Sequence, residues 1–131
     1  MADFYTSRFA DNVRLAKSRS ILTPAAGILN LVRLPKNAFV KKVWLKVITV
    51  GSSDTISIGW IGNGETAQAA GFLSTDIAKV TVAGMKESTK DTLVSESSKY
   101  FSGASGSLTM TIGTTQTTGS FLVFCEYSVI Y

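Results

Sequence analysis

The sequence predicts an all-β fold: an antiparallel β-sandwich of the jelly-roll type, with about seven or eight strands and an extended N-terminal arm. Three observations support this prediction. The C-terminal residues form one long apolar stretch with strand periodicity, several earlier segments alternate apolar and polar residues, and turn-forming glycine, serine and threonine separate them. With 131 residues and 45% hydrophobic content, the chain is long enough for one domain with a buried core.

The final strand, predicted over residues 117–131, organises the others. Its odd positions, from Phe121 to Tyr131, are apolar or aromatic, whereas its even positions are mixed. Side chains alternate between the two faces of a strand, so the odd positions are predicted to face the core. Among the even positions, Leu122, Phe124 and Ile130 are more apolar than a solvated face requires. Two interpretations are open for them: a subunit interface, which we favour, or coverage by the N-terminal arm.

Residues 1–26 are predicted to form the arm, and residues 27–131 the sandwich domain. The arm is polar with scattered aromatic residues, and a turn-forming stretch separates it from the body. Phe9, Val13 and Ala16 fit one face of a short helix. Because so short a helix is marginal alone, the arm is expected to gain order by docking on a partner.

Five earlier strands are predicted from runs of alternating apolar residues. They cover residues 28–34, 38–50, 55–61, 77–83 and 107–113, and a further weak strand is expected near residues 93–94. Within them, the residues expected to face the core are Val43, Leu45, Val47, Ile56, Ile58, Trp60, Val80, Val82, Leu108, Met110 and Ile112. The second and third of these strands are joined by a short polar turn, as are the fifth and the final strand, so each pair is predicted to be a hairpin. Residues 66–73 fit either a helical turn or a loop.

Basic residues are concentrated in the first third of the chain. Up to Lys46 there are nine basic and two acidic residues, and after it four basic and seven acidic ones. This asymmetry predicts either an acidic partner for the first third or a solvated arm. The arm residues expected to contact such a partner are Arg8, Arg14 and Arg19.

A second candidate contact lies on the strand predicted over residues 38–50. Lys42, Trp44 and Lys46 alternate with the core positions, so they share the outward face. An aromatic ring between two cations can stack a nucleobase, and tryptophan is also favoured at protein contacts. No neighbouring strand offers a matching row of aromatic and basic residues. We therefore favour a protein contact, or coverage by the arm, over nucleic acid.

The residue types provide no candidate active site, metal site or cofactor site. The sequence has no histidine, so a serine or cysteine nucleophile lacks its usual base. Six acidic residues lie in turn-like segments, where solvated charges are expected: Asp54, Glu65, Asp76, Glu87, Asp91 and Glu96. The motif from Gly62 to Ala67 matches G-x-G-x-x-A, but too little sequence follows for a crossover helix, so a turn is predicted.

The single Cys125 lies on the core face of the last strand and is predicted to be a small buried hydrophobic residue. No apolar run is long enough for a membrane-spanning helix. The protein is therefore expected to be neither an enzyme nor a membrane protein, and to need no cofactor.

Residues 34–131 carry a resemblance to a known kind of protein. The segments that carry it are 34–40 (LPKNAFV), 43–47 (VWLKV), 55–59 (TISIG), 69–76 (AAGFLSTD) and 118–123 (TGSFLV) with the aromatic strand that follows. Together they resemble small β-sandwich structural proteins of tailed-bacteriophage virions, especially capsid cement (decoration) proteins. These motifs are patterns of strands and turns, and similar modules occur in head fibres and tails.

The resemblance implies a structural role. Members of this group are typically homotrimers on the outer capsid lattice, and an extended arm grips neighbouring subunits of the major capsid protein. It implies that the chain is made in the host cytoplasm and resides on the capsid surface. Removal of residues 1–20 is expected to abolish capsid binding without unfolding the body. The alternative is a receptor- or glycan-binding module of a head fibre or tail, with Trp60, Tyr100 and Phe101 as an aromatic platform.

Overall fold

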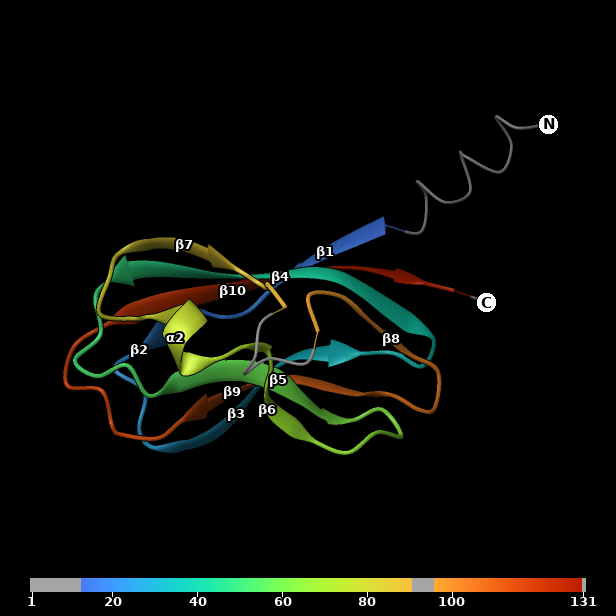
Figure 1. Cartoon of the computed structure of the whole chain (residues 1–131), viewed down its shortest axis with the longest axis horizontal. Helices are drawn as coiled ribbons and strands as arrows, with labels where there is room; N and C mark the ends of the chain where they lie inside the picture. The colour runs from blue at the N-terminus through green and yellow to red at the C-terminus, as the bar shows by residue number, and fades with distance from the viewer. Residues whose placement is uncertain (1–12, 91–95, 131) are drawn as a thin grey trace.

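The computed structural model describes residues 13–90 and 96–130, which form two antiparallel β-sheets packed face to face (Figure 1). Sheet A contains, in spatial order, β1 (Val13–Lys17), β10 (Ser120–Val129), β4 (Ala38–Thr49) and β7 (Gly84–Glu87). The short strands β2 (Ile21–Leu22) and β8 (Lys99–Phe101) pair with β10 and β4 respectively. Sheet B contains β3 (Gly27–Leu34), β9 (Gly106–Ile112), β5 (Ile56–Gly62) and β6 (Gln68–Leu73) in that order. The predicted antiparallel β-sandwich is confirmed.

The core lies between the sheets and is made by alternate residues of the long strands. The strands with a clear apolar alternation bury most of the set that the sequence assigns to the core. The buried residues confirming those assignments are Val43, Leu45, Val47, Ile56, Ile58, Trp60, Leu108, Met110, Ile112, Phe121, Val123 and Cys125. Beyond Cys125 the prediction for β10 is wrong: Tyr127 and Val129 are only partly buried, and Ser128 is buried instead, because the pairing with β4 shifts after Glu126. Tyr131 lies outside the described residues.

Strand β4 directs apolar residues to the core along most of its twelve residues, although a bulge interrupts the alternation once. The pairing of β10 with β4 shifts between Glu126 and Tyr127, where Lys41 of β4 has no partner. A bulge of this kind inserts one extra residue into one strand. As a result Val40 and Val43 are both fully buried, although they are three residues apart.

Both predicted hairpins are wrong, because each of these connections crosses from one sheet to the other. β4 belongs to sheet A and β5 to sheet B, and β9 belongs to sheet B and β10 to sheet A. Each of the four strands has an apolar face, and stacking those faces across the core buries more apolar surface than placing them side by side. The polar turns between them are also longer than the two-residue loops of tight hairpins.

A buried glutamine ties the two crossing loops together. Gln116 Oε1 accepts hydrogen bonds from the backbone N–H groups of Ser52 and Ser53, at 2.9 and 3.2 Å. Its Nε2 donates to the carbonyl oxygens of Ser53 and Thr114, and its own backbone N–H donates to Pro24. Gly51 is required beside it, since a Cβ there would lie 2.6 Å from Gln116 Oε1.

The strand predicted over residues 77–83 is also wrong. A single-turn helix, α2 (Thr75–Ala78), begins after the N-cap Ser74 and ends at Lys79 in the left-handed conformation. Of the two residues predicted to face inward, Val80 is buried and Val82 is exposed. Both alternatives for residues 66–73, a helical turn and a loop, are wrong, because Gln68–Leu73 form strand β6. The weak strand expected near residues 93–94 lies outside the described residues.

Part of the predicted arm belongs to sheet A. Residues Val13–Lys17 form a strand rather than the expected helix, and they pair along β10 from Phe124 to Ser128. Ser18 continues this attachment, because its Oγ accepts the Val123 N–H at 3.0 Å. Deleting residues 1–20 would therefore remove an edge strand, so a deletion of residues 1–12 is the cleaner test of the arm.

Candidate functional site

The candidate site is the outer face of sheet A, where side chains of β1, β10, β4 and β7 form an apolar groove of about 410 Å³. Its lining residues are Val13, Leu15, Trp44, Met85, Phe124 and Glu126. The strand register explains this convergence. Phe124 of β10 lies between Lys17 of β1 and Trp44 of β4, and Trp44 in turn lies opposite Glu87 of β7.

The groove presents large apolar side chains to solvent. Leu15 is 68% exposed and Met85 58% exposed, and both aromatic residues of the groove are partly exposed. Contiguous exposed apolar patches of this kind mark interaction surfaces. Tryptophan, phenylalanine and methionine are also the residue types enriched at the centres of protein interfaces. The outer face of sheet A therefore has the composition of a protein contact.

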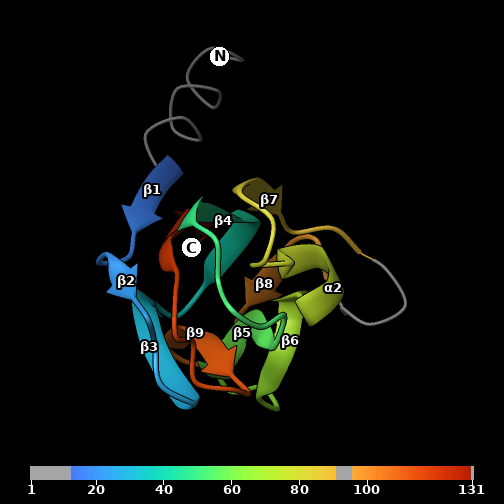
Figure 2. The ribbon, with the colours of Figure 1, turned by 90° about the vertical axis from the view of Figure 1, so that its left-hand side faces the viewer.

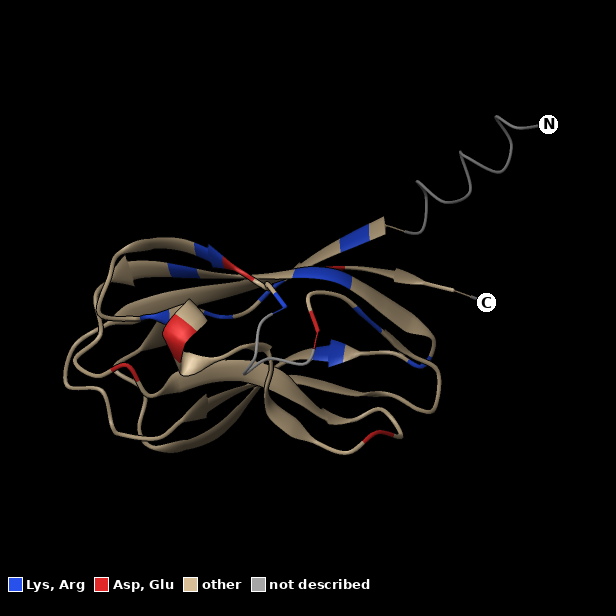
Figure 3. Cartoon of the chain, viewed as in Figure 1, with Lys and Arg blue, Asp and Glu red and all other residues tan. Residues whose placement is uncertain are grey.

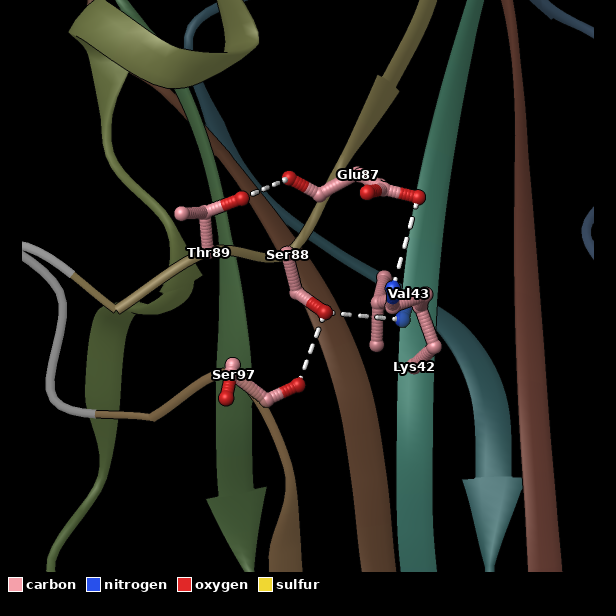
Figure 4. A network of polar contacts seen from close by, with 6 residues as sticks. All are labelled: Lys42, Val43, Glu87, Ser88, Thr89 and Ser97. Carbon is pink, nitrogen blue, oxygen red and sulfur yellow. Dashed lines mark hydrogen bonds and ion pairs between the residues drawn. The ribbon is translucent and has the colours of Figure 1, made fainter.

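Charged groups border the groove. Lys42 and Glu87 form an ion pair at 3.5 Å across the β4–β7 edge (Figure 4). Both side chains are substantially solvated, so this pair contributes little to stability. The exposed Lys46 lies between Leu122 and Met85 in the register, and Lys17 lies beside Phe124. Cations next to exposed apolar groups can meet carboxylates at the rim of an interface.

A buried serine holds β7 in place beneath the groove. Ser88 Oγ accepts the Val43 N–H at 3.1 Å and donates to the Ser97 carbonyl at 2.8 Å (Figure 4). The Ser88 N–H also donates to the Val43 carbonyl. These bonds join the end of β7 to the centre of sheet A and fix the strand that presents Met85 and Glu87 to the groove.

The two sheets differ sharply in charge (Figure 3). The strands of sheet A carry nine charged residues: Arg14, Lys17, Lys41, Lys42, Lys46, Lys86, Glu87, Lys99 and Glu126. The strands of sheet B carry one, Arg33. The capacity to select a charged partner is therefore concentrated in sheet A.

The structure brings together five of the eight contact residues expected from the sequence. Lys42, Trp44, Lys46, Leu122 and Phe124 all lie on the outer face of sheet A, in adjacent positions of β4 and β10.

The arm arginines are placed differently. Arg14 lies opposite Tyr127, so it is on the other side of β1 from Leu15, and it is exposed at the sheet edge. Arg19 lies in the link between β1 and β2, away from the groove, and Arg8 lies outside the described residues.

Sequence reasoning missed Leu15 and Met85 as members of this surface. Leu15 was assigned to the arm, and Met85 lies in a polar segment whose short strand has no apolar alternation. The alternation of Val13 and Leu15 with Arg14 and Ala16 was the available signal for β1.

The described residues hold no cluster of three or more histidine, cysteine, aspartate or glutamate side chains that could bind a metal ion. Cys125 is buried as predicted, and burial raises the pKa of its thiol to about 12. Asn63 and Gly64 form the predicted turn after β5, both with positive φ. Across residues 13–90 and 96–130, none of the helices has the length and apolar character needed to cross a membrane.

The aromatic platform expected for glycan binding is wrong. Trp60 and Phe101 are core residues, 3% and 0% exposed, and they pack edge to face at a centroid distance of 5.4 Å. Phe72 completes the cluster, and the Lys99 ammonium lies 5.3 Å from the Trp60 ring centre. Of the three expected residues only Tyr100 is exposed.

The sequence matches no protein-family model and no curated protein, but the fold matches known structures. The chain is similar to a chain in the acid-stable capsid of Helicobacter pylori bacteriophage KHP30, with a TM-score of 0.62 and 21% identity over 88% of this chain and 86% of the other. It is similar to a chain of the cyanophage Pam1 capsid asymmetric unit, with a TM-score of 0.65 and 18% identity over 91% and 86%. A chain in the capsid of Ralstonia phage GP4 gives a TM-score of 0.62 and 18% identity over 91% and 85%. This chain therefore shares its β-sandwich fold with chains found in three phage capsids.

Proposed function

We propose that this chain is a structural protein of a phage virion, and specifically a cement (decoration) protein that binds the outer lattice of the major capsid protein. The observation that carries the proposal is the extent of the structural matches. They cover nearly equal, large shares of both chains, so the matching capsid chains have about the length of this one. A separate chain of this size within a capsid is consistent with a cement protein.

The outer face of sheet A is the proposed contact surface. It combines an apolar groove with bordering lysines, which suits a capsid surface that offers apolar and acidic side chains. The role is structural rather than catalytic, and it is performed on the virion surface after synthesis in the host cytoplasm.

The mechanism is thermodynamic. A protein that binds the assembled lattice but not its free subunits stabilises the assembly by mass action. Association into a homotrimer would link three such contacts, and linked contacts bind more tightly than single ones because the later ones become intramolecular. Residues 1–26, with Arg8, Arg14 and Arg19, are proposed to add further capsid contacts.

The proposal is tested by co-sedimentation of the purified protein with empty capsid shells assembled without it. The wild-type protein is expected to bind the shells and to raise the temperature at which they disassemble. Replacement of the exposed groove residues, Leu15→Lys and Met85→Lys, is expected to weaken binding by at least about tenfold. Ile61→Lys on sheet B is the matched control, because Ile61 is also an exposed apolar residue.

Two results would contradict parts of the proposal. If the wild-type protein does not bind the shells, it is not a cement protein. If Ile61→Lys loses as much binding as the groove variants, the outer face of sheet A is not the specific contact. Light scattering gives the oligomeric state: a homotrimer has three times the chain mass of 14.0 kDa.

A further inference from the structure

A second groove lies at the open side of the sandwich, where the edges of the two sheets face each other. Ser18, Arg19 and Ile21 form one wall, and Leu29, Asn30 and Leu31 of β3 form the other, around a volume of about 410 Å³. Figure 2 shows β1, β2 and β3 on this same side of the molecule. The groove is separate from the apolar groove on the outer face of sheet A, and the two share no lining residue.

Strand β3, which forms the second wall, lies at the edge of sheet B. Its outer edge is the least protected strand edge in the described structure. β3 pairs with β9 alone among the described strands, so its other edge presents unpaired backbone groups. Proteins normally protect such edges with lysine, proline, or very short strands. β3 has eight residues, a single charge at Arg33 and no proline.

The other edges are protected. β1 carries Arg14 and Lys17 in five residues, and β7 and β8 have only four and three residues, each with a lysine. β6 has six residues, and its edge is partly covered, because the Gly71 carbonyl accepts a hydrogen bond from the Glu96 N–H. Among the described strands, β3 alone has an unprotected edge. This indicates that the edge is available for pairing with another strand.

The backbone of β3 supplies a further reason for a partner strand. Its pairing with β9 shifts between Asn30 and Val32, which leaves Leu31 without a partner in the ladder. The residue left over in a bulge has backbone groups that the ladder does not satisfy. Leu31 is one of the three β3 residues that line the groove.

We propose that β3 receives an extended segment of the capsid protein as an added antiparallel or parallel strand, seated in the groove between β3 and residues 18–21. This inference rests on the proposed function and adds the site and the mode of attachment. Main-chain hydrogen bonds to the edge would provide affinity, and the groove walls would select side chains.

The groove walls define the chemistry of that segment. Ile21, Leu29 and Leu31 offer apolar contacts, whereas the exposed Arg19 offers a guanidinium. Among the residues that the structure describes, no acidic side chain lines the groove. A segment that alternates apolar residues with a carboxylate fits both, because alternate side chains of a strand point in opposite directions. At roughly 3.3 Å per residue, the three β3 positions in the groove match about three to four residues of the segment.

Hydrogen–deuterium exchange tests the proposal directly, because strand addition protects backbone amides. The full-length protein is measured alone and bound to empty capsid shells assembled without it. We expect amide exchange within residues 27–34 to slow by at least about tenfold on binding. Binding of Leu29→Lys and Arg19→Glu is expected to fall by about tenfold, whereas Ile61→Lys retains wild-type affinity. Thermal denaturation of each variant confirms that it folds.

The outcomes separate this inference from the proposed function. Absence of wild-type binding to the shells would refute the cement role itself. Binding with protection confined to β1, β4, β7 and β10 would leave the cement role intact and overturn strand addition at β3. Unchanged binding of both Leu29→Lys and Arg19→Glu would also overturn it.

Discussion

The inner faces of the two sheets are alike, and their outer faces are not. Both inner faces are continuous apolar layers, with fully buried residues such as Leu45 in sheet A and Ile58 in sheet B. On the outside, sheet A presents Trp44, Phe124 and several charges. The outward positions of β5 and β9 in sheet B are instead small polar residues, Ser57, Thr109 and Thr111, and the first two are buried. Folding requires both inner faces to be apolar, because they pack against each other. Binding to a partner requires apolar and charged side chains on only one outer face.

Truncating a buried side chain on either inner face should lower the free energy of unfolding by a similar amount. This loss should exceed that of the other substitutions described below. Leu45→Ala and Ile58→Ala each remove buried methyl and methylene groups and leave a cavity. Each is expected to lower the free energy of unfolding by about 2–5 kcal/mol. Chemical denaturation measures both values. A loss below about 1 kcal/mol in one variant alone would show that the two halves of the core are not equivalent.

Loss of the hydrogen bonds that Gln116 makes between the two crossing loops should have the next largest effect on stability. Gln116→Ala removes hydrogen bonds to Ser52, Ser53 and Thr114, and it leaves backbone groups of the crossing loops without their partner. We expect a loss of about 1–3 kcal/mol in unfolding free energy. Thr117→Ala, at an exposed position in the same loop, is the control and should change stability little. Equal stability of the two variants would contradict a linking role for Gln116.

The outer faces should differ in binding rather than in stability. Trp44→Ala and Thr111→Ala change two partly buried residues, one on each outer face. Thr111→Ala is expected to alter stability by less than about 0.5 kcal/mol, and Trp44→Ala by about 1 kcal/mol. Binding to capsid shells should fall only for Trp44→Ala. A loss of binding in both variants would show that the outer face of sheet B also takes part.

The smallest effect is expected at a solvated contact of a crossing loop. Asp54 accepts hydrogen bonds from the backbone N–H and hydroxyl of Thr81, at 3.0 and 2.8 Å. The backbone hydrogen bond is the main cause that lowers the pKa of this carboxyl below 3.8, with the Thr81 hydroxyl, Lys79 and Lys86 acting in the same direction and desolvation opposing them.

Because the folded pKa is the lower one, the ionised carboxylate stabilises the fold above pH 3.8, and this contribution disappears as the pH falls through the folded pKa. Asp54→Asn should therefore be less stable than wild type at pH 7 by less than about 0.5 kcal/mol, since solvent screens the site. Thermal unfolding at pH 7 and near pH 2 measures the difference, which should vanish at the lower pH. A difference that grows on acidification would contradict this assignment.

Period-two alternation was sufficient to predict the fold class and most of the core. It assigned the inward residues of β4, β5, β9 and β10, because a strand has only two faces and the apolar one must be buried. The same rule placed Lys42, Trp44, Leu122 and Phe124 on an outward face. It failed between Ser74 and Val82, where a capping serine and a left-handed residue at Lys79 make a helical turn.

Local alternation and residue chemistry are enough to predict a β-sandwich with a buried cysteine and an outward row of lysines around a tryptophan. Strand pairing cannot be predicted in this way, because register and sheet membership depend on contacts between residues far apart in the chain. Two hairpins became crossings tied by Gln116, and residues 13–17 became an edge of sheet A. The same long-range pairing placed Leu15 and Met85 beside Trp44 and left β3 with a free edge, so both proposed contact sites exist only in the folded molecule.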